Sequence, residues 1–267
     1  NWDVSDTATL TDMFTDADLM LSNQGFSATP TSADFNQPIG TIFTDRTSLD
    51  TAVAAWIEDE AAATETYGDI NTWDVSAITD FSALFHNETS FNSDISNWDV
   101  SAGTDFNNMF TRAAAFNQDI SSWDVSAGTH FGWMFIRAHA FNQDIGGWDV
   151  SSGNTFTGMF SDAETFDQNI SNWDVSNGTK FETMFRNTEA FNQDIGGWVV
   201  SSGNDFNNMF LNADAFNQNI SYWDVSETVN LYKMFEEADL MISNFGFSST
   251  PTSADFNKIR ITDRTSL

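Results

Sequence analysis

Apolar residues recur along this chain with a period of 25 residues. Each period contains the pattern Ile-x-x-Trp-x-Val, and the tryptophans of this pattern are Trp73, Trp98, Trp123, Trp148, Trp173, Trp198 and Trp223. Because side chains alternate between the two faces of a strand, each Trp and the Val two residues later are predicted to share one face of a short strand. A fixed period of this length is typical of a repeat protein whose units pack only against their neighbours.

A second apolar pattern begins eight residues after each tryptophan. It reads Phe-x-x-Met-Phe in most repeats, as from Phe131 to Phe135. This spacing puts the apolar residues on one side of a helical turn and predicts a short helical return arm. The predicted fold class is a leucine-rich-repeat-like solenoid, with short parallel strands stacked about 4.8 Å apart into a ladder. Its Trp and Phe side chains are predicted to form the core.

A segment without repeats precedes the first complete period. Leu49, Val53 and Trp56 fall on one face of a predicted helix, and Gly68 suits its end. We interpret this amphipathic helix as a cap, because terminal units of repeat proteins need one. The predicted organisation is the end of a preceding unit at 1–19, a linker at 20–44, the capping helix at 45–68, seven coils at 69–240 and a linker to the next unit at 241–267.

The two ends of the chain carry the same sequence. Residues 222–257 repeat residues 1–36 at an offset of 221 residues, as in "TPTSADFN". Two arrangements fit this duplication: tandem super-units of about 221 residues within a longer polypeptide, or separate subunits that join head to tail. A head-to-tail contact that does not close into a ring generates a filament. Both arrangements predict an extended fibre.

The net charge of the chain limits the classes of partner that it can bind. Lys and Arg number 9 against 39 Asp and Glu, so the net charge is −30. Nucleic acid and anionic membrane surfaces are therefore disfavoured, since both require a basic face. The chain has no cysteine, which excludes disulfides and thiol chemistry, and no apolar run reaches the roughly 20 residues of a membrane span.

Acidic residues form two columns that suit a hard cation. Ca²⁺ takes 6 to 8 oxygen ligands, and the calcium candidates are Asp99, Asp124, Asp149 and Asp174 after the tryptophans, and Asp94, Asp119, Asp144 and Asp194 before the isoleucines. No recognised calcium-binding motif is present, however. An Asp in a turn also accepts backbone N–H bonds, and this structural role is the favoured interpretation. No cofactor is required.

Other candidate sites are weaker. The N-glycosylation pattern occurs at Asn87, Asn169, Asn177 and Asn219. The chain has histidines at 86, 130 and 139. The latter two occupy positions that other repeats fill with Asp, Asn, Lys, Glu or Ala, which favours surface roles. No catalytic motif is present, so the chain is not expected to be an enzyme.

The full repeat, W-D-V-S-x-x-T-x-F-x-x-M-F-x-x-A-x-x-F-N-Q-D-I-S, resembles that of the DUF285 family of BspA-like leucine-rich-repeat surface proteins. The resemblance covers residues 69–240 and "NWDVSDTATLTDMF" at the start. It departs from the family pattern at Gly103, Gly128 and Gly153, where the family has Val, which suggests a tighter turn. The resemblance implies a secreted or cell-surface protein associated with adhesion, and no catalytic residues.

The predicted function is an extracellular structural or adhesive repeat protein that forms a fibre with copies of itself, either head to tail or in tandem. Cell-surface or matrix molecules are further candidate partners. The alternative is a cell-surface binding module that recognises a glycan, a host protein or ice through its strand face. An incomplete column of threonines suits ice: Thr79, Thr104, Thr129 and Thr179.

Overall fold

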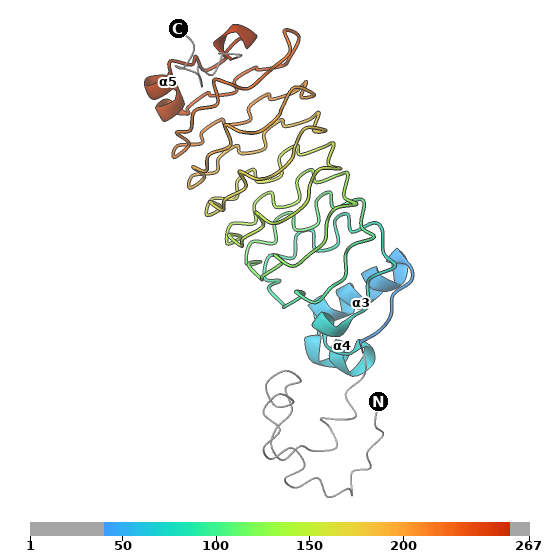
Figure 1. The fold of residues 1–267 in the computed structure, drawn as a ribbon. Coiled ribbons are helices and arrows are strands. Elements are labelled where there is room, and N and C mark those ends of the chain that lie inside the picture. Colours follow the sequence, from blue (N-terminus) through green and yellow to red (C-terminus); the bar gives the residue numbers. More distant parts are fainter. Residues whose placement is uncertain (1–39, 257–267) are drawn as a thin grey trace, which may run out of the picture.

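The computed structural model describes residues 40–256. The predictions for residues 1–39 and 257–267 lie outside the described residues. Between the ends, 25-residue coils are stacked one on another, with helices α3 (Arg46–Glu58) and α4 (Glu60–Tyr67) at one end and α5 (Asp239–Phe245) at the other (Figure 1). Two short 3₁₀ turns, η1 (Ile70–Thr72) and η2 (Ser253–Asp255), complete the regular structure.

The predicted leucine-rich-repeat-like solenoid with a strand ladder is wrong. Residues 40–256 contain no strand and only three α-helices, none of them in the return arms. Neighbouring coils are joined instead by isolated parallel bridges, which run from Asp80 with Asp105 to Asp205 with Asn230. These coil-to-coil bridges lie seven residues after each tryptophan, outside the Ile-x-x-Trp-x-Val segment in which the strand was expected. The bridge of Ile42 with Asp74 does fall in such a segment, but it joins the first coil to the residues before α3.

The Phe-x-x-Met-Phe arm is a run of turns because some of its residues are left-handed. Trp133 has φ 55° and Arg137 has φ 58°, values that break a helix. Every second N–H group of the arm therefore points along the stacking axis, toward the next coil. They donate to carbonyl oxygens of the next coil at N–O distances of 2.7–2.9 Å: Phe131 to Thr155, Trp133 to Thr157, Phe135 to Met159 and Arg137 to Ser161.

Aromatic columns fill the inside of the coils. The rings of Phe110 and Phe135 stack with centroids 5.5 Å apart and planes 5° apart, and Phe141 lies 3.9 Å from Phe135 within one coil. Trp123 and Trp148 stack at 6.5 Å in a separate column. The seven repeat tryptophans are at most 4% exposed, so the prediction that these aromatics form the core is confirmed.

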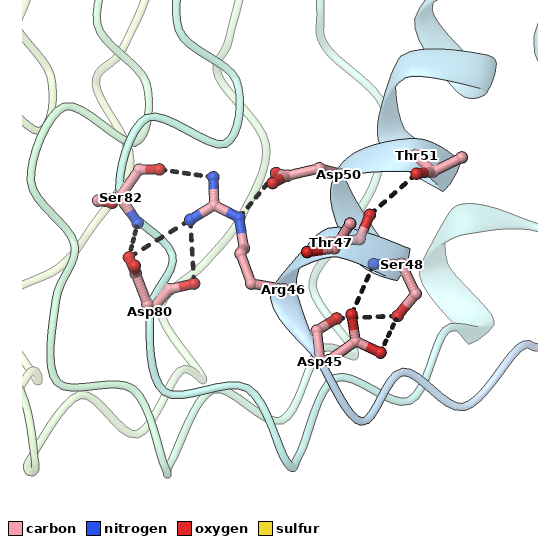
Figure 2. Close-up of polar contacts among 8 residues, drawn as sticks. All are labelled: Asp45, Arg46, Thr47, Ser48, Asp50, Thr51, Asp80 and Ser82. Carbon is pink, nitrogen blue, oxygen red and sulfur yellow. Dashed lines mark hydrogen bonds and ion pairs between the residues drawn. The ribbon is translucent and has the colours of Figure 1, made fainter.

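Two helices close the first coil where one was predicted. Asp59 separates them, with φ −153°, and its carboxylate accepts the N–H of Ala62 to cap α4. Trp56 of α3 meets Trp73 edge to face at 5.9 Å. Figure 2 shows how α3 is tied to the coils: the Arg46 guanidinium donates to the Asp80 carboxylate and to the carbonyl oxygen of Ser82, at 3.3 and 2.7 Å.

The last coil is also covered. Residues 241–256 were predicted to be a linker, but Met241, Phe247 and Phe256 are at most 3% exposed. The Phe235 N–H donates to the Ser249 carbonyl oxygen at 3.0 Å, a bond that an internal coil makes with its neighbour. Because Phe247 also lies 4.9 Å from the Phe235 ring, this segment packs on the stack as a second cap.

Candidate functional site

The aspartates that follow the tryptophans close turns. Asp149 Oδ1 accepts the Ser151 N–H at 3.0 Å, and the same bond to the Ser two residues later is made by Asp99, Asp124 and Asp174. Hydrogen bonds from the side chain and the backbone of Ser151 lower the pKa of the Asp149 carboxyl below its usual value. Each carboxylate is therefore engaged by its own turn.

The second acidic column has the same role. Its N–H donors lie two residues further on, at 2.9–3.0 Å, and the column comprises Asp94, Asp119, Asp144 and Asp194. Within residues 40–256, no three His, Asp or Glu side chains come together as a metal site requires. For all eight calcium candidates the geometry supports the turn role that the sequence favoured.

The Phe-Asn-Gln motif has a role that sequence reasoning missed. Asn117 Oδ1 accepts the N–H of Asn142, one coil later, at 2.9 Å, and the Gln143 amide donates to the Asn117 carbonyl oxygen at 2.8 Å. Corresponding bonds recur along the column from Asn92 to Asn217, except that Gln168 donates to Asn142 Oδ1 instead of the carbonyl oxygen. The signal was present in the sequence, because each of these coils has Asn or Asp at this position.

The remaining predicted residues lie on the surface. The four glycosylation candidates are exposed; Asn169 and Asn219 replace Asp in the turns, Asn177 donates to Ser151, and Asn87 lies on a turn arm. The threonine column does not present free hydroxyls, since Thr104, Thr129 and Thr179 donate to carbonyl oxygens of the preceding coil. His139 lies 3.2 Å from Glu164.

A groove on three successive turn arms is the candidate functional site. It has a volume of about 500 Å³, and its lining includes His86, Asn108, Arg112, Trp133, Ile136 and Arg137. No Asp or Glu lines it, although acidic residues outnumber basic ones 39 to 9 in the chain. We refer to it as the Trp133 groove.

Trp133 is unlike the repeat tryptophans. It is 41% exposed, and it occupies a surface position of the turn arm. Its indole lies over Gly158 of the next coil, where an added Cβ would be 2.6 Å from Trp133 Cδ1. Gly158 occupies the same repeat position as Trp133, where the remaining coils carry Ala, Asn, Thr or Lys, so the glycine makes room for the indole.

A comparison with known protein families finds one whose sequence pattern matches this chain. The pattern of the family described as "Mycoplasma protein of unknown function, DUF285" matches residues 56–166 and 148–246. The chain belongs to the DUF285 family. The match itself assigns no activity and does not include the BspA-like leucine-rich-repeat description, and no curated protein and no solved structure matches the chain. Within the described part of this DUF285 chain, no helix is long and apolar enough to cross a membrane.

The electrostatics of the groove are unusual for this DUF285 chain. Arg137 Nε lies 3.7 Å from the Asp162 carboxylate, which Arg186 of the next coil also approaches to 3.8 Å. Arg112 donates to Asn87 Oδ1 at 3.3 Å. The groove therefore offers hydrogen-bond donors to an acceptor-rich ligand.

Proposed function

We propose that this DUF285 chain is an extracellular structural or adhesive repeat protein, built from closed rods of stacked coils that are joined in tandem into a fibre. The extracellular assignment rests on the resemblance of the repeats to surface proteins. The observation that carries the structural role is the aromatic stacking, which continues from coil to coil between Phe85 and Phe235.

Such a stack is suited to a mechanical role. Backbone hydrogen bonds, the asparagine column and the ring columns all connect consecutive coils, so bending the rod strains several sets of contacts at once. The net charge of −30 disfavours lateral association of rods. Growth along the axis then depends on the ends.

The caps favour tandem units over head-to-tail assembly. Phe247 and Phe256 cover the last coil, and α3 covers the first through Trp56. The backbone row at each end is partly occupied within the described residues: the N–H groups of Lys233 and Phe235 donate to the cap of the last coil, and Arg46 donates to the carbonyl oxygens of Asp80 and Ser82 in the first. Because residues 1–36 duplicate the sequence that forms the last coil and its cap, we infer that each super-unit of a longer polypeptide is closed before the next begins.

Negative-stain electron microscopy tests this arrangement. The purified 267-residue chain should give separate rods in calcium and in excess chelator. A tandem gene in which residues 1–221 precede the full chain should give two rods joined end to end. Filaments from the single chain in both conditions would instead support head-to-tail assembly, and filaments that dissolve in chelator would make calcium the joint.

The Trp133 groove favours a second candidate function, which is ligand binding by the surface of the rod. Trp and Arg are the residue types that most often dominate binding energy at protein surfaces. Here they lie on the turn arms instead of a strand face, and they belong to three coils only. A local site of this kind suits recognition of a ligand group better than a regular array such as ice.

A further inference from the structure

The Trp133 indole N–H has no acceptor among residues 40–256. Among the nine tryptophans in residues 40–256, the other eight donate this group to a carbonyl or hydroxyl oxygen at 2.7–3.2 Å. Trp133 makes no such bond within the described residues, while 41% of its surface is exposed. A ligand oxygen is the acceptor that this indole lacks.

Arg112 also has hydrogen-bond donors that lack a charged partner. Six Lys and Arg side chains lie within residues 40–256, and five of them have a carboxylate within 4.0 Å: Arg46, Arg137, Lys180, Arg186 and Lys233. Arg112 is the exception in this part of the chain. Its guanidinium offers five N–H donors in a planar fork that matches a carboxylate, and the bond to Asn87 Oδ1 uses one of them.

We propose that the Trp133 groove binds a carboxylated saccharide, such as a uronic acid residue of an acidic polysaccharide. The sugar carboxylate would pair with Arg112, with Arg137 nearby. The negatively polarised face of the indole attracts the C–H groups of a sugar ring. The indole N–H, which lies in the ring plane on the edge near Gly158, would donate to a hydroxyl of the adjoining sugar. The proposal deepens the second candidate function and does not depend on tandem assembly.

The dimensions and charge of the site favour a saccharide over an acidic protein. A volume of about 500 Å³ lies within the range of small-ligand sites. A stable protein partner buries about 800 Å² on each side, which would extend beyond the groove onto the surface of a chain with a net charge of −30. A single sugar acid contacts the basic groove alone.

The other coils of the chain supply substitutions that should preserve folding. Asn occupies the position of Trp133 in two other coils, as Asn108 and Asn208, and the position of Arg112 in three, as Asn87, Asn187 and Asn212. All five asparagines have φ of 54–66°, so Trp133→Asn and Arg112→Asn fit the left-handed backbone.

Two control variants match these changes outside the groove. Lys180→Thr removes one positive charge, as Arg112→Asn does, and introduces the residue found at Thr155 of the preceding coil. Tyr232→Asn removes an aromatic side chain that is 55% exposed, and it introduces the residue of Asn207. Thermal denaturation of all four variants checks that each remains folded.

Isothermal titration calorimetry of the full chain with trigalacturonate tests the proposal. Saturable binding is expected, weakened roughly tenfold or more by Arg112→Asn and by Trp133→Asn, and changed by less than about twofold in the two controls. The fully methyl-esterified trisaccharide, which has the same rings without charge, should bind at least about tenfold more weakly.

Three results would overturn the proposal. One is the absence of saturable binding, and another is equal binding of the methyl ester, because the carboxylate would then play no part. The third is tighter binding of a hexaglutamate peptide that depends on Arg112, which would assign the groove to an acidic polypeptide. None of these results bears on whether the rods are closed, so they are distinguishable from failure of the proposed fibre.

Discussion

The two arms of each coil hold the stack together by different means. In the turn arm, backbone N–H groups such as that of Phe135 bond to the next coil. In the arm that contains the repeat tryptophan, no backbone hydrogen bond joins residues 148–150 to residues 123–125 or 173–175, all of them described residues. There the Trp148 indole donates to the Ile120 carbonyl oxygen at 3.0 Å.

This difference explains why some repeat positions carry the same residue in every coil and others vary. The tryptophan arm depends on side chains, and all seven coils keep Trp and Val there. The turn arm joins coils through its backbone, so its surface side chains can change without loss of those bonds. At the position of Trp133 the seven coils carry Ala, Asn, Trp, Gly, Thr, Asn and Lys. A binding site can therefore arise on the turn arm at little structural cost.

The largest expected effect is the loss of stability when a tryptophan of the tryptophan arm is replaced, compared with replacement of the exposed tryptophan of the turn arm. Trp148→Ala should lower the free energy of unfolding by about 3–5 kcal/mol, because it empties a buried site. Trp133→Asn should change it by less than about 0.5 kcal/mol, as for other surface substitutions. Urea denaturation measures both, and equal losses would contradict the division of roles.

A smaller loss should follow when the ring is kept and its hydrogen bond is removed. Trp148→Phe leaves the Ile120 carbonyl oxygen without its indole donor and also reduces the buried ring. The expected loss is about 1–3 kcal/mol. Urea denaturation that showed no loss would mean that the tryptophan arm is joined by packing alone.

The asparagine column should contribute less again. Asn142 Oδ1 accepts the Asp167 N–H and the Gln168 amide, at 3.0 and 2.9 Å. Asn142→Ala removes both bonds, with an expected loss of about 1–2 kcal/mol. Asn142→Asp is the matched control, because Asp167 already fills this position in the next coil and accepts the Asn192 N–H. This control should retain most of the stability at neutral pH.

The smallest effect concerns pH. Because hydrogen bonds from Ser151 lower the folded-state pKa of Asp149, its ionised form stabilises the fold at neutral pH. That contribution is present above the unfolded-state pKa, near about 4, and it is lost as the pH falls through the lower folded value. Asp149→Asn keeps an acceptor, as Asn169 does in the equivalent turn of the other acidic column, and removes the titration.

Urea denaturation of the parent and of Asp149→Asn between neutral and acid pH provides the test. The parent should be slightly more stable at neutral pH, and the difference should vanish in acid. A difference that grew in acid would show that repulsion within the acidic column outweighs the turn bonds.

Sequence periodicity predicts the core of this molecule but not its hydrogen bonds. Trp148 and Phe135 are buried as expected, because the pattern reports which side chains face inward. A strand requires a backbone partner as well, and the Trp-x-Val alternation is equally compatible with an extended segment without one. The left-handed backbone at Trp133 and Arg137 is not evident from these two residues themselves. Its signal lies in the other coils, which often carry Asn, Asp or Gly at the same positions, and these are the residues that adopt it most readily.

The candidate site was even harder to predict. The eight aspartates form regular columns, so the sequence could suggest both a turn role and a metal, and the turn geometry was the favoured alternative. The Trp133 groove breaks the repeat instead of following it. Its signal is a Trp beside Gly158 and Arg112, whose hydrogen bond goes to Asn87 and not to a carboxylate, a combination that only the stacking of coils brings together.

Amide hydrogen exchange followed by NMR is the most direct test of where the coils are bonded. The amides of Phe131, Trp133, Phe135 and Arg137 should be strongly protected, because each donates to the next coil. The amide of Asp149, an exposed residue in the tryptophan arm, should exchange much faster. Equal protection at Asp149 would indicate a strand ladder through the tryptophan arm and contradict the account.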